Sequence, residues 1–524
     1  MRRSGIVAAV AALLVLSTTQ ASAATPDAPL TVHVDSGTLH GNENETTRHF
    51  LGVPYAKPPV GALRWASPQP AAHWSGVREA TQRGSSCPQT AAGPGQPASA
   101  DEDCLFVNVT TPRHVAPGAK LPVMVWWHGG GYTSGAGDGY NADRLAAQGN
   151  VIVVTLNYRL GIFGYYGLPG LRGSGTFGLQ DQIAGLRWAK RNATAFGGDA
   201  DNLTIFGESA GGMSVCAMLT SPQARGLVDK AIISSGSCKL DWPAGALFPG
   251  VPADRPYLSL HQDQADGVET AHSNGCTGNE LACMRAKPAA DLVPLNQSFS
   301  DHLSYGTPVL PLDPSTALRH RQFLRVPVIS GGNRDEQRAF AGGAAMADPT
   351  LITDQTYPTL LRNAFGPDAD RVAAHYPISR YGSALLAWST ATTDAAWACP
   401  TATGDRELAA HTTVYPYEFA DPSAPNVNGI TIPGFSPGAA HASDLPSLFD
   451  LGGTNLLRTP GQQSLAATMI AYWTTFARTG NPNHAGAPFW PTTSGTRQLQ
   501  LAPGHIQEAN VAAQHQCGFW VTVH

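Results

Sequence analysis

Charged residues are scarce in this chain of 524 residues. Lys, Arg, Asp and Glu together make up 14 % of the sequence, well below the roughly 25 % of an average globular protein. The balance is 33 basic against 38 acidic residues, a formal net charge of −5, and no basic stretch of domain size is present. Because nucleic acid binding needs such a stretch, we expect no nucleic acid partner. The substrate is expected to be neutral or only weakly charged.

Several other signatures are missing as well. The sequence has no internal repeat, no G-X-Y period and no long Ser/Pro/Gly linker, which excludes collagen-like and low-complexity chains and favours one large domain with insertions. It contains no C-x-x-C pair and no H-E-x-x-H motif, so we expect no metal and no cofactor. A G-x-G-x-x-G match over 173–178 lacks the buried strand that a dinucleotide site requires before it.

Long apolar runs are confined to the N-terminus. Arg2 and Arg3 precede an apolar run over 6–16, and Ala-Ser-Ala follows at 21–23. This order is typical of a secretory signal with a small-residue cleavage site, and we predict cleavage after Ala23. A membrane anchor is the alternative, but the run is about half the roughly 20 residues that span a bilayer. The protein is therefore expected to be secreted, without stable membrane insertion.

The cysteines fit an oxidising compartment. An even number of cysteines in an exported chain favours disulfides over metal sites. Spacing alone permits 105 pairings of eight cysteines, so the residues by themselves leave the connectivity open. The eight lie at positions 87, 104, 216, 238, 276, 283, 399 and 517.

Apolar, β-rich runs alternate with segments of helical periodicity, the clearest at 178–196 and 211–219. This alternation predicts an α/β protein with a large, mostly parallel sheet covered by helices on both faces. Weaker periodicity over 243–313 and 341–400 predicts helical insertions, and residues 24–524 are expected to form a single domain. The predicted strands are 105–110, 121–127, 151–156, 203–206, 231–234, 326–329 and 414–419.

Ser209 is the predicted nucleophile. It stands in a G-x-S-x-G motif between the predicted strand 203–206 and the helix 211–219. A serine hydroxyl attacks only when a base removes its proton, and a sharp strand-to-helix turn exposes it to that base. Gly207 and Gly211 supply the space that such a turn needs. A chance match is common in a glycine-rich chain, but the strand before and the helix after are the context that this motif requires.

A glycine run upstream predicts the groups that stabilise an oxyanion. The strand 121–127 opens into His128 and three glycines at 129–131. A tetrahedral intermediate needs N–H donors about 3 Å from its oxygen, and glycine lets the backbone approach that closely. We predict an oxyanion hole from the N–H groups of Gly130, Gly131 and Ala210. The alternative is a tight loop without such a role.

The base and the acid follow from chain order, which for this motif runs serine, acid, histidine. Two carboxylates, Asp335 and Glu336, come just after the strand 326–329, and one of them is expected to orient the imidazole. His441 lies in a small-residue loop after the strand 414–419, whereas His411 precedes that strand and would lie at its wrong end. His441 is therefore the predicted base.

Five sequence blocks carry a family resemblance. They are 50–59 (FLGVPYAKPP), 102–109 (EDCLFVNV), 157–164 (NYRLGIFG), 196–199 (FGGD) and 476–482 (FARTGNP). In these blocks, their order and the motifs above, the chain resembles the type-B carboxylesterases, the α/β-hydrolase family that includes cholinesterases and para-nitrobenzyl esterases. The resemblance implies the α/β-hydrolase fold with helical insertions over the active site, a small-molecule ester substrate and no cofactor.

The resemblance also implies roles for particular residues. The catalytic triad would be Ser209, Glu336 and His441, with Asp335 supporting it and Glu208 as a buried carboxylate near the active site. Cys216 and Cys238 have no family precedent, so a fourth disulfide stays open. The disulfides implied by the family are Cys87–Cys104, Cys276–Cys283 and Cys399–Cys517.

Two departures from the family pattern bear on the substrate. Gln337 replaces the usual glycine after the acid, and residues 89–100 contain no aromatic side chain that could stack on a cationic head group. We therefore expect a general esterase and not a cholinesterase, with Tyr132, Phe340 and Gln337 as candidate pocket residues, although either aromatic could instead be core packing.

The expected function is a secreted serine esterase with a Ser-His-Glu acyl-enzyme mechanism and broad specificity for neutral short- to medium-chain esters. Two alternatives are a lipase or polyester hydrolase that acts at interfaces, and a non-catalytic, cholinesterase-like binding protein. An exposed apolar rim and a flexible lid would favour the first, and an incomplete triad the second.

Overall fold

The structure, a computed structural model, describes residues 28–91, 97–116, 118–300, 303–493 and 497–523. The predicted signal peptide at residues 1–23 lies outside the described residues. Among the helices that are described, none is both long and apolar enough to cross a membrane.

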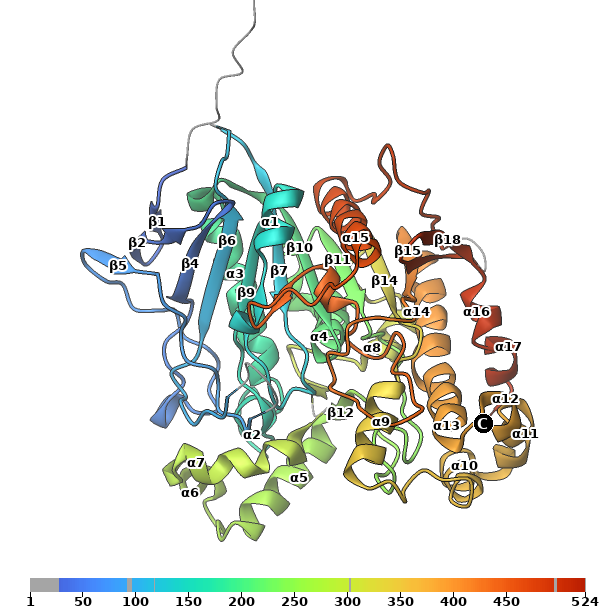
Figure 1. Ribbon diagram of the computed structural model, residues 1–524. Coiled ribbons are helices and arrows are strands. Elements are labelled where there is room, and N and C mark those ends of the chain that lie inside the picture. Colours follow the sequence, from blue (N-terminus) through green and yellow to red (C-terminus); the bar gives the residue numbers. More distant parts are fainter. Residues whose placement is uncertain (1–27, 92–96, 117, 301–302, 494–496, 524) are drawn as a thin grey trace, which may run out of the picture.

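An eleven-stranded mixed sheet forms the centre of the molecule (Figure 1). Its middle is parallel from β9 through β7, β10, β11, β14 and β15 to β17, whereas the strands outside this stretch pair antiparallel. All seven predicted strands are present. In sheet order the strands are β18 (His505–Ala509), β17 (Gln498–Ala502), β15 (Val414–Phe419), β14 (Val328–Asn333), β11 (Lys230–Ser234), β10 (Gly198–Glu208), β7 (Leu121–Trp127), β9 (Ile152–Leu156), β6 (Phe106–Pro112), β4 (Thr47–Pro54) and β3 (Asn42–Glu43).

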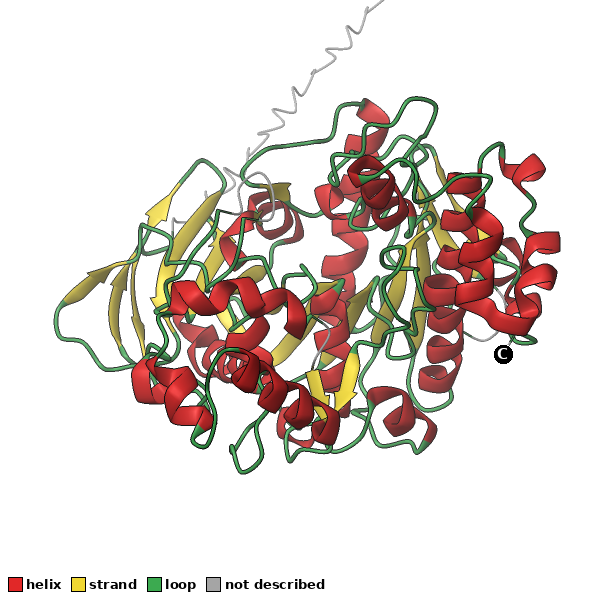
Figure 2. Cartoon of the chain, turned by 90° about the horizontal axis from the view of Figure 1, so that it is seen from below, coloured by secondary structure: helices red, strands yellow, loops and turns green. Residues whose placement is uncertain are grey.

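Helices cover both faces of this sheet (Figure 2). Successive residues of a strand point to opposite faces, and β7 shows this directly. Val123 and Val125 share one apolar cluster with α3 (Phe177–Asn192) and α4 (Ala210–Thr220). Met124 and Trp126 share a second cluster with residues of α1 (Asp143–Gly149) and α15 (Pro460–Thr479). Because both faces are buried, the central strands read as continuous hydrophobic runs.

The two predicted insertions are largely helical. In Figure 1, helices of both lie beyond the lower end of the sheet. The first also contains a short parallel strand pair that the sequence did not predict, β12 (Tyr257–Ser259) with β13 (Leu303–Tyr305). Their elements include α5 (Leu260–Ser273), α6 (Glu280–Ala286) and α7 (Ala289–Leu292) in the first, and α9 (Arg338–Ala347), α10 (Tyr357–Phe365), α11 (Ala369–His375), α12 (Ile378–Tyr381), α13 (Ala384–Thr393) and the π-helix η7 (Asp394–Ala398) in the second.

All eight cysteines are bonded in pairs. Three disulfides are those that the family resemblance implied, Cys87–Cys104, Cys276–Cys283 and Cys399–Cys517. The fourth, which the sequence left open, joins Cys216 of α4 to Cys238 just beyond β11. It therefore ties the helix behind Ser209 to the neighbouring strand connection.

Candidate active site

Ser209 occupies the turn between β10 and α4. Its backbone angles are φ 57° and ψ −127°, a conformation that costs a non-glycine residue about 1–3 kcal/mol and that clusters at functional sites. The turn has no room for larger neighbours, since a Cβ on Gly211 would lie 1.9 Å from the carbonyl oxygen of Trp127 and one on Gly207 2.5 Å from Gly211. The two glycines thus permit the tight turn, as the motif predicted.

Ser209 lines a cavity of about 630 Å³. Among the described residues that line it, the ionisable groups are Glu208 and His441, both beside Ser209, and the phenol of Tyr140. The rest of the lining is uncharged. The lining residues are Gly129, Gly130, Gly131, Ser134, Gly139, Tyr140, Glu208, Ser209, Met213, Trp242, Leu247, Phe340, Trp397, Asn426, Val427, Asn428, His441, Ala442, Leu445, Leu451, Gly452, Thr454 and Leu456.

Glu336 and His441 come from two neighbouring strands and meet beside Ser209. Glu336 follows β14, His441 lies in the loop after β15, and the imidazole Nδ1 is 2.6 Å from Glu336 Oε2. The second carboxylate oxygen, Oε1, accepts hydrogen bonds from Ser235 Oγ at 2.6 Å and from the backbone N–H of Asn333 at 2.7 Å. Glu336 is 2 % exposed. Its orientation is therefore fixed from both sides.

Asp335 holds the loop that carries His441. Its carboxylate accepts a hydrogen bond from the backbone N–H of Ala439 at 3.0 Å and pairs with Arg338 at 2.9 Å. Its own backbone N–H donates to the carbonyl oxygen of Ala439 at 2.9 Å. The two neighbouring carboxylates thus contact different targets, Glu336 the imidazole and Asp335 the backbone just before it.

A second carboxylate faces the other side of the imidazole. Glu208, 2 % exposed, places Oε1 3.2 Å from His441 Nε2. Neither atom makes a hydrogen bond within the described structure, so Ser209 is not hydrogen-bonded to the imidazole either. Burial raises the pKa of Glu208 to about 8. Burial alone would lower the pKa of His441, but the charges of Glu208 and Glu336 outweigh it and raise this pKa to about 9.

The glycine run 129–131 packs closely against Ser209. A Cβ on Gly129 would lie 2.9 Å from Ser209 Cβ, and Gly130 and Gly131 have φ values of 101° and 58°, which favour glycine. Within the described chain, the backbone N–H groups of Gly130, Gly131 and Ala210 donate no hydrogen bond. Three donors around the serine are thus free to bind a ligand oxygen.

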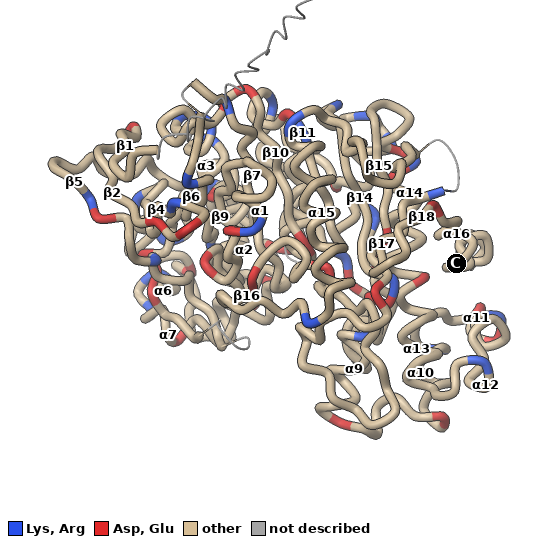
Figure 3. Tube along the Cα trace, turned by 45° about the horizontal axis from the view of Figure 1, so that its top comes forward, with Lys and Arg blue, Asp and Glu red and all other residues tan. Residues whose placement is uncertain are grey.

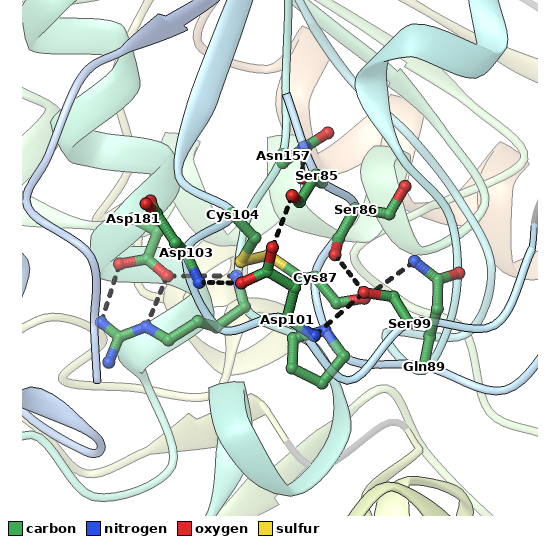
Figure 4. The surroundings of a disulfide bond; sticks show 12 residues. Ser85, Ser86, Cys87, Gln89, Ser99, Asp101, Asp103, Cys104, Asn157 and Asp181 are labelled. Atoms are coloured by element: carbon green, nitrogen blue, oxygen red, sulfur yellow. Dashed lines mark hydrogen bonds and ion pairs between the residues drawn. A yellow bond between two sulfur atoms is a disulfide. The ribbon is translucent and has the colours of Figure 1, made fainter. Parts of the chain in front are cut away.

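The loop closed by the disulfide Cys87–Cys104, whose surroundings are drawn in Figure 4, contacts the segment that follows this glycine run. The side chain of Gln89, inside that loop, accepts from the backbone N–H of Gly135 at 2.8 Å and donates to its carbonyl oxygen at 3.0 Å. Asn157 accepts from the N–H of Gly137 at 2.8 Å and donates to Ser85 at 2.9 Å. The disulfide loop therefore holds the segment that follows the three glycines.

Of the three candidate pocket residues, Tyr132 and Gln337 are not among the described residues that line this cavity. Tyr132 is fully buried against Tyr165 and Ser214. Gln337 is also fully buried, and its side-chain amide lies between the carbonyl oxygen of Ala246 and the indole nitrogen of Trp397, 3.1 Å from each. A polar side chain at this depth is held by hydrogen bonds to its neighbours and does not face the substrate space.

The third, Phe340, is part of an aromatic wall that the sequence did not reveal. Phe340 stacks on Trp397 with ring centroids 5.8 Å apart, and Trp397 packs on Trp242 at 5.6 Å. Trp397 and Phe340 also contact the imidazole of His441, at 4.9 and 5.1 Å. Trp397 comes from the π-helix η7, and such helices occur often at functional sites.

The ionisable side chains that meet at this site are two carboxylates, Glu208 and Glu336, on either side of the imidazole of His441. In the part of the chain that the structure describes, no group of three or more His, Cys, Asp or Glu side chains could hold a metal ion. The two carboxylates and the imidazole are groups that can take up and release protons.

A mostly parallel sheet with helices on both faces, and a serine on a strained turn at the carboxyl end of a central strand, define the α/β-hydrolase class. A model of the carboxylesterase family matches residues 28–520. The chain belongs to this family and is a type-B carboxylesterase, an enzyme that hydrolyses carboxylic esters.

Relatives match over most of their length. The chain is 32 % identical to cocaine esterase from Homo sapiens, over 91 % of this chain and 87 % of that protein. It is 34 % identical to para-nitrobenzyl esterase from Bacillus subtilis (strain 168), over 90 % and 95 %. The solved structure of a thermophilic PNB esterase superposes with a TM-score of 0.77, at 30 % identity, over 94 % of this chain and 100 % of that one.

Proposed function

We propose that the protein is a secreted serine esterase in which Ser209 is the nucleophile, His441 the general base and acid, and Glu336 the residue that orients His441. The observation that carries the proposal is the 2.6 Å contact between His441 and Glu336 beside a cavity that Ser209 also lines. The mature chain, residues 24–524, would form a single α/β-hydrolase domain. Its four disulfides agree with an oxidising compartment.

The first half-reaction transfers the acyl group to the enzyme. His441 Nε2 turns from Glu208 towards Ser209 Oγ and takes its proton while the oxygen attacks the ester carbonyl; such hydrogen bonds often form only when substrate binds. The N–H groups of Gly130, Gly131 and Ala210 bind the carbonyl oxygen as it becomes negative, each donor contributing about 3–4 kcal/mol. The ester C–O bond then breaks, protonated His441 gives its proton to the leaving alcohol oxygen, and the acyl group stays on Ser209 Oγ.

The second half-reaction returns the enzyme to its starting state. Water takes the place of the alcohol, His441 removes a proton from it, and the resulting hydroxide attacks the acyl-enzyme carbonyl. The C–O bond to Ser209 breaks, and His441 returns the proton to Oγ. The products are one carboxylic acid and one alcohol for each ester and water consumed.

The cavity supports neutral esters as the substrate class. The described residues of its lining include no Lys or Arg that would bind an anionic group, and its aromatic wall stacks against apolar substituents. A cavity of about 630 Å³ accommodates short- to medium-chain esters. A non-catalytic binding protein would not need a nucleophile, a base, an acid and free N–H donors assembled around one cavity.

A series of p-nitrophenyl esters from acetate to palmitate tests the proposal. We expect a burst of nitrophenol close to one equivalent per enzyme, because acylation releases the alcohol before water attacks. Turnover should be highest with short to medium acyl chains. Absence of both burst and turnover across the series would contradict the esterase mechanism.

Activity is expected to rise with pH because His441 must be neutral to act as a base. Its pKa is about 9, so kcat/KM should increase through this value. Glu208→Gln removes a negative charge 3.2 Å from His441 Nε2 and lowers the pKa of His441. The midpoint of the pH profile of kcat/KM should therefore shift down by about one pH unit. The measurement is the pH dependence of kcat/KM with p-nitrophenyl acetate. The control is Glu280→Gln, because Glu280 lies beside a histidine on the surface, His272. An unchanged midpoint in Glu208→Gln would refute the role of Glu208 in raising the pKa of His441.

A further inference from the structure

His515 lies in a C-terminal segment that has no other charged side chain. Residues 509–523 contain no Lys, Arg, Asp or Glu, and Figure 3 shows α16 (Val511–Gln514), just before His515, in the colour of uncharged residues. His515 itself is buried, with 5 % of its surface exposed. Burial of an ionisable side chain costs free energy unless the group is paired and hydrogen-bonded. The surroundings of His515 must therefore supply its partners.

Two buried carboxylates contact the two ring nitrogens of His515. Nδ1 is 2.5 Å from Asp394 Oδ1, and Nε2 is 2.5 Å from Glu418 Oε1. A neutral imidazole has only one N–H group, so both nitrogens donate only when the ring is protonated. Burial alone would lower the pKa of His515, but the charges of Asp394 and Glu418 outweigh it and raise this pKa well above its usual value. His515 is therefore a buried cation between two anions.

The remaining oxygens of both carboxylates have partners as well. The hydroxyl of Tyr376 donates to Asp394 Oδ2 at 2.7 Å, and Gln500 Nε2 donates to Glu418 Oε2 at 2.7 Å. Arg334 Nε lies 3.5 Å from the same Glu418 oxygen and offsets the second negative charge. A buried polar network with all its members satisfied is rigid. It fixes the elements that contribute to it relative to one another.

One of these elements is the π-helix η7, which the C-terminal segment holds at both ends. Asp394 is the first residue of η7. Cys399 directly follows η7 and is bonded to Cys517, two residues after His515. Helix α17 (Cys517–Trp520) also packs against η7. Since Glu418 belongs to β15, the network connects η7 to the central sheet.

η7 in turn carries Trp397, the middle ring of the aromatic wall. The ring of Trp397 contacts the imidazole of His441, with centroids 4.9 Å apart, and lines the substrate cavity. Trp397 also borders a second, small cavity of about 30 Å³, together with Glu336 and Glu418. A shift of η7 would therefore move Trp397 relative to the imidazole and to any molecule in the substrate cavity.

We propose that His515 is a positioning residue, whose ion pairs with Asp394 and Glu418 hold η7 so that Trp397 packs against His441 and a bound ester. This inference rests on the proposed function and deepens it by naming a remote side chain that sets the shape of the substrate site. His515 does not touch the substrate. It acts through the sensitivity of such sites to geometry, where a misplacement of about 1 Å costs about 100-fold in rate.

His515→Gln tests the proposal, because glutamine has no charge and cannot bridge two carboxylates on opposite sides of a ring. We expect kcat/KM with p-nitrophenyl acetate to fall about tenfold through the displaced wall. Binding of p-nitroanisole, an ether that is not hydrolysed, should weaken about threefold or more, because it loses contact with the same wall. The measurements are initial rates and the Kd from quenching of tryptophan fluorescence.

A double-mutant cycle with Trp397→Ala separates positioning from a general loss of stability. If His515 acts through Trp397, His515→Gln should lower kcat/KM by less than about twofold in the Trp397→Ala background. Equal losses in both backgrounds would overturn the proposal. Tyr376→Phe is a milder second variant, which removes one hydrogen bond to Asp394 and keeps all charges. It should show the same dependence on Trp397 with a loss of about threefold, and it keeps the test decisive if His515→Gln does not fold.

The matched control is His49→Gln. His49 Nε2 lies 2.6 Å from Asp143 Oδ1, and the described residues that line the substrate cavity include neither. Both kcat/KM and the Kd of p-nitroanisole should stay within about twofold of wild type. Wild-type values in His515→Gln and Tyr376→Phe would also overturn the proposal. Because p-nitroanisole binding needs no catalysis, failure of the esterase mechanism would appear as missing turnover in wild type, with the difference in binding retained.

Discussion

Ser209→Ala is expected to abolish ester hydrolysis and leave the fold intact. Removal of Oγ eliminates the atom that forms the acyl-enzyme in the proposed mechanism, and loss of the nucleophile from a cooperating serine–histidine pair lowers kcat by about 10⁶-fold. The cavity and the oxyanion donors do not involve this oxygen, so a dissolved ester still binds. The measurements are kcat with p-nitrophenyl acetate and the thermal unfolding midpoint.

Ser209→Gly separates catalysis from backbone strain. Glycine adopts the φ of 57° at position 209 without steric cost, which removes about 1–3 kcal/mol of strain and exceeds the roughly 0.5–1 kcal/mol that glycine costs in chain entropy. We therefore expect a midpoint at or above that of wild type, with activity as low as in Ser209→Ala. Wild-type activity in either variant would remove Ser209 from the mechanism.

The central strands were predictable because burial on both faces makes them uniformly apolar. The predicted bounds of β7 and β15 match the structure, and those of β14 differ because β14 begins two residues later and continues to Asn333. The outer strands β18, β17, β4 and β3 were not predicted. In β18, three of the five residues are exposed, one is half-buried and only Ala509 is buried, and β4 contains Arg48 and His49. Such mixed composition at a sheet edge lacks the hydrophobic run that marks a central strand.

Chain order predicts that Ser209, Glu336 and His441 lie close together because each follows a parallel strand, and the carboxyl ends of parallel strands lie at one edge of a sheet. The aromatic wall has no comparable local signal. Trp242 and Trp397 lie 155 positions apart in the sequence, about the length of a typical domain, and their rings meet only through tertiary packing, with centroids 5.6 Å apart. Gln337 is a candidate pocket residue because it follows Glu336 in the sequence. In the structure, the hydrogen bonds of its side-chain amide hold it in the core.

Glu336→Gln is expected to lower kcat by about 10⁴-fold without preventing folding. A neutral amide cannot stabilise the imidazolium that forms during attack. If its NH₂ group donates to His441 Nδ1, the ring proton moves to Nε2, and Nε2 can then no longer accept the proton of Ser209. Substrate binding does not involve Glu336, so KM with p-nitrophenyl acetate should change far less than kcat.

Asp444 is the matched comparison, because it is another buried carboxylate near the imidazole. It is 1 % exposed, burial raises its pKa to about 6, and it accepts a hydrogen bond from Asn333 Nδ2 at 3.2 Å. It contacts Asn333 and not the ring of His441, so Asp444→Asn should retain most of kcat. If kcat instead fell about 10⁴-fold in Asp444→Asn and stayed near the wild-type value in Glu336→Gln, the residue that orients His441 would be Asp444. Retention of activity in both variants would show that His441 needs neither carboxylate, and the 2.6 Å contact would then hold the loop in place without serving catalysis.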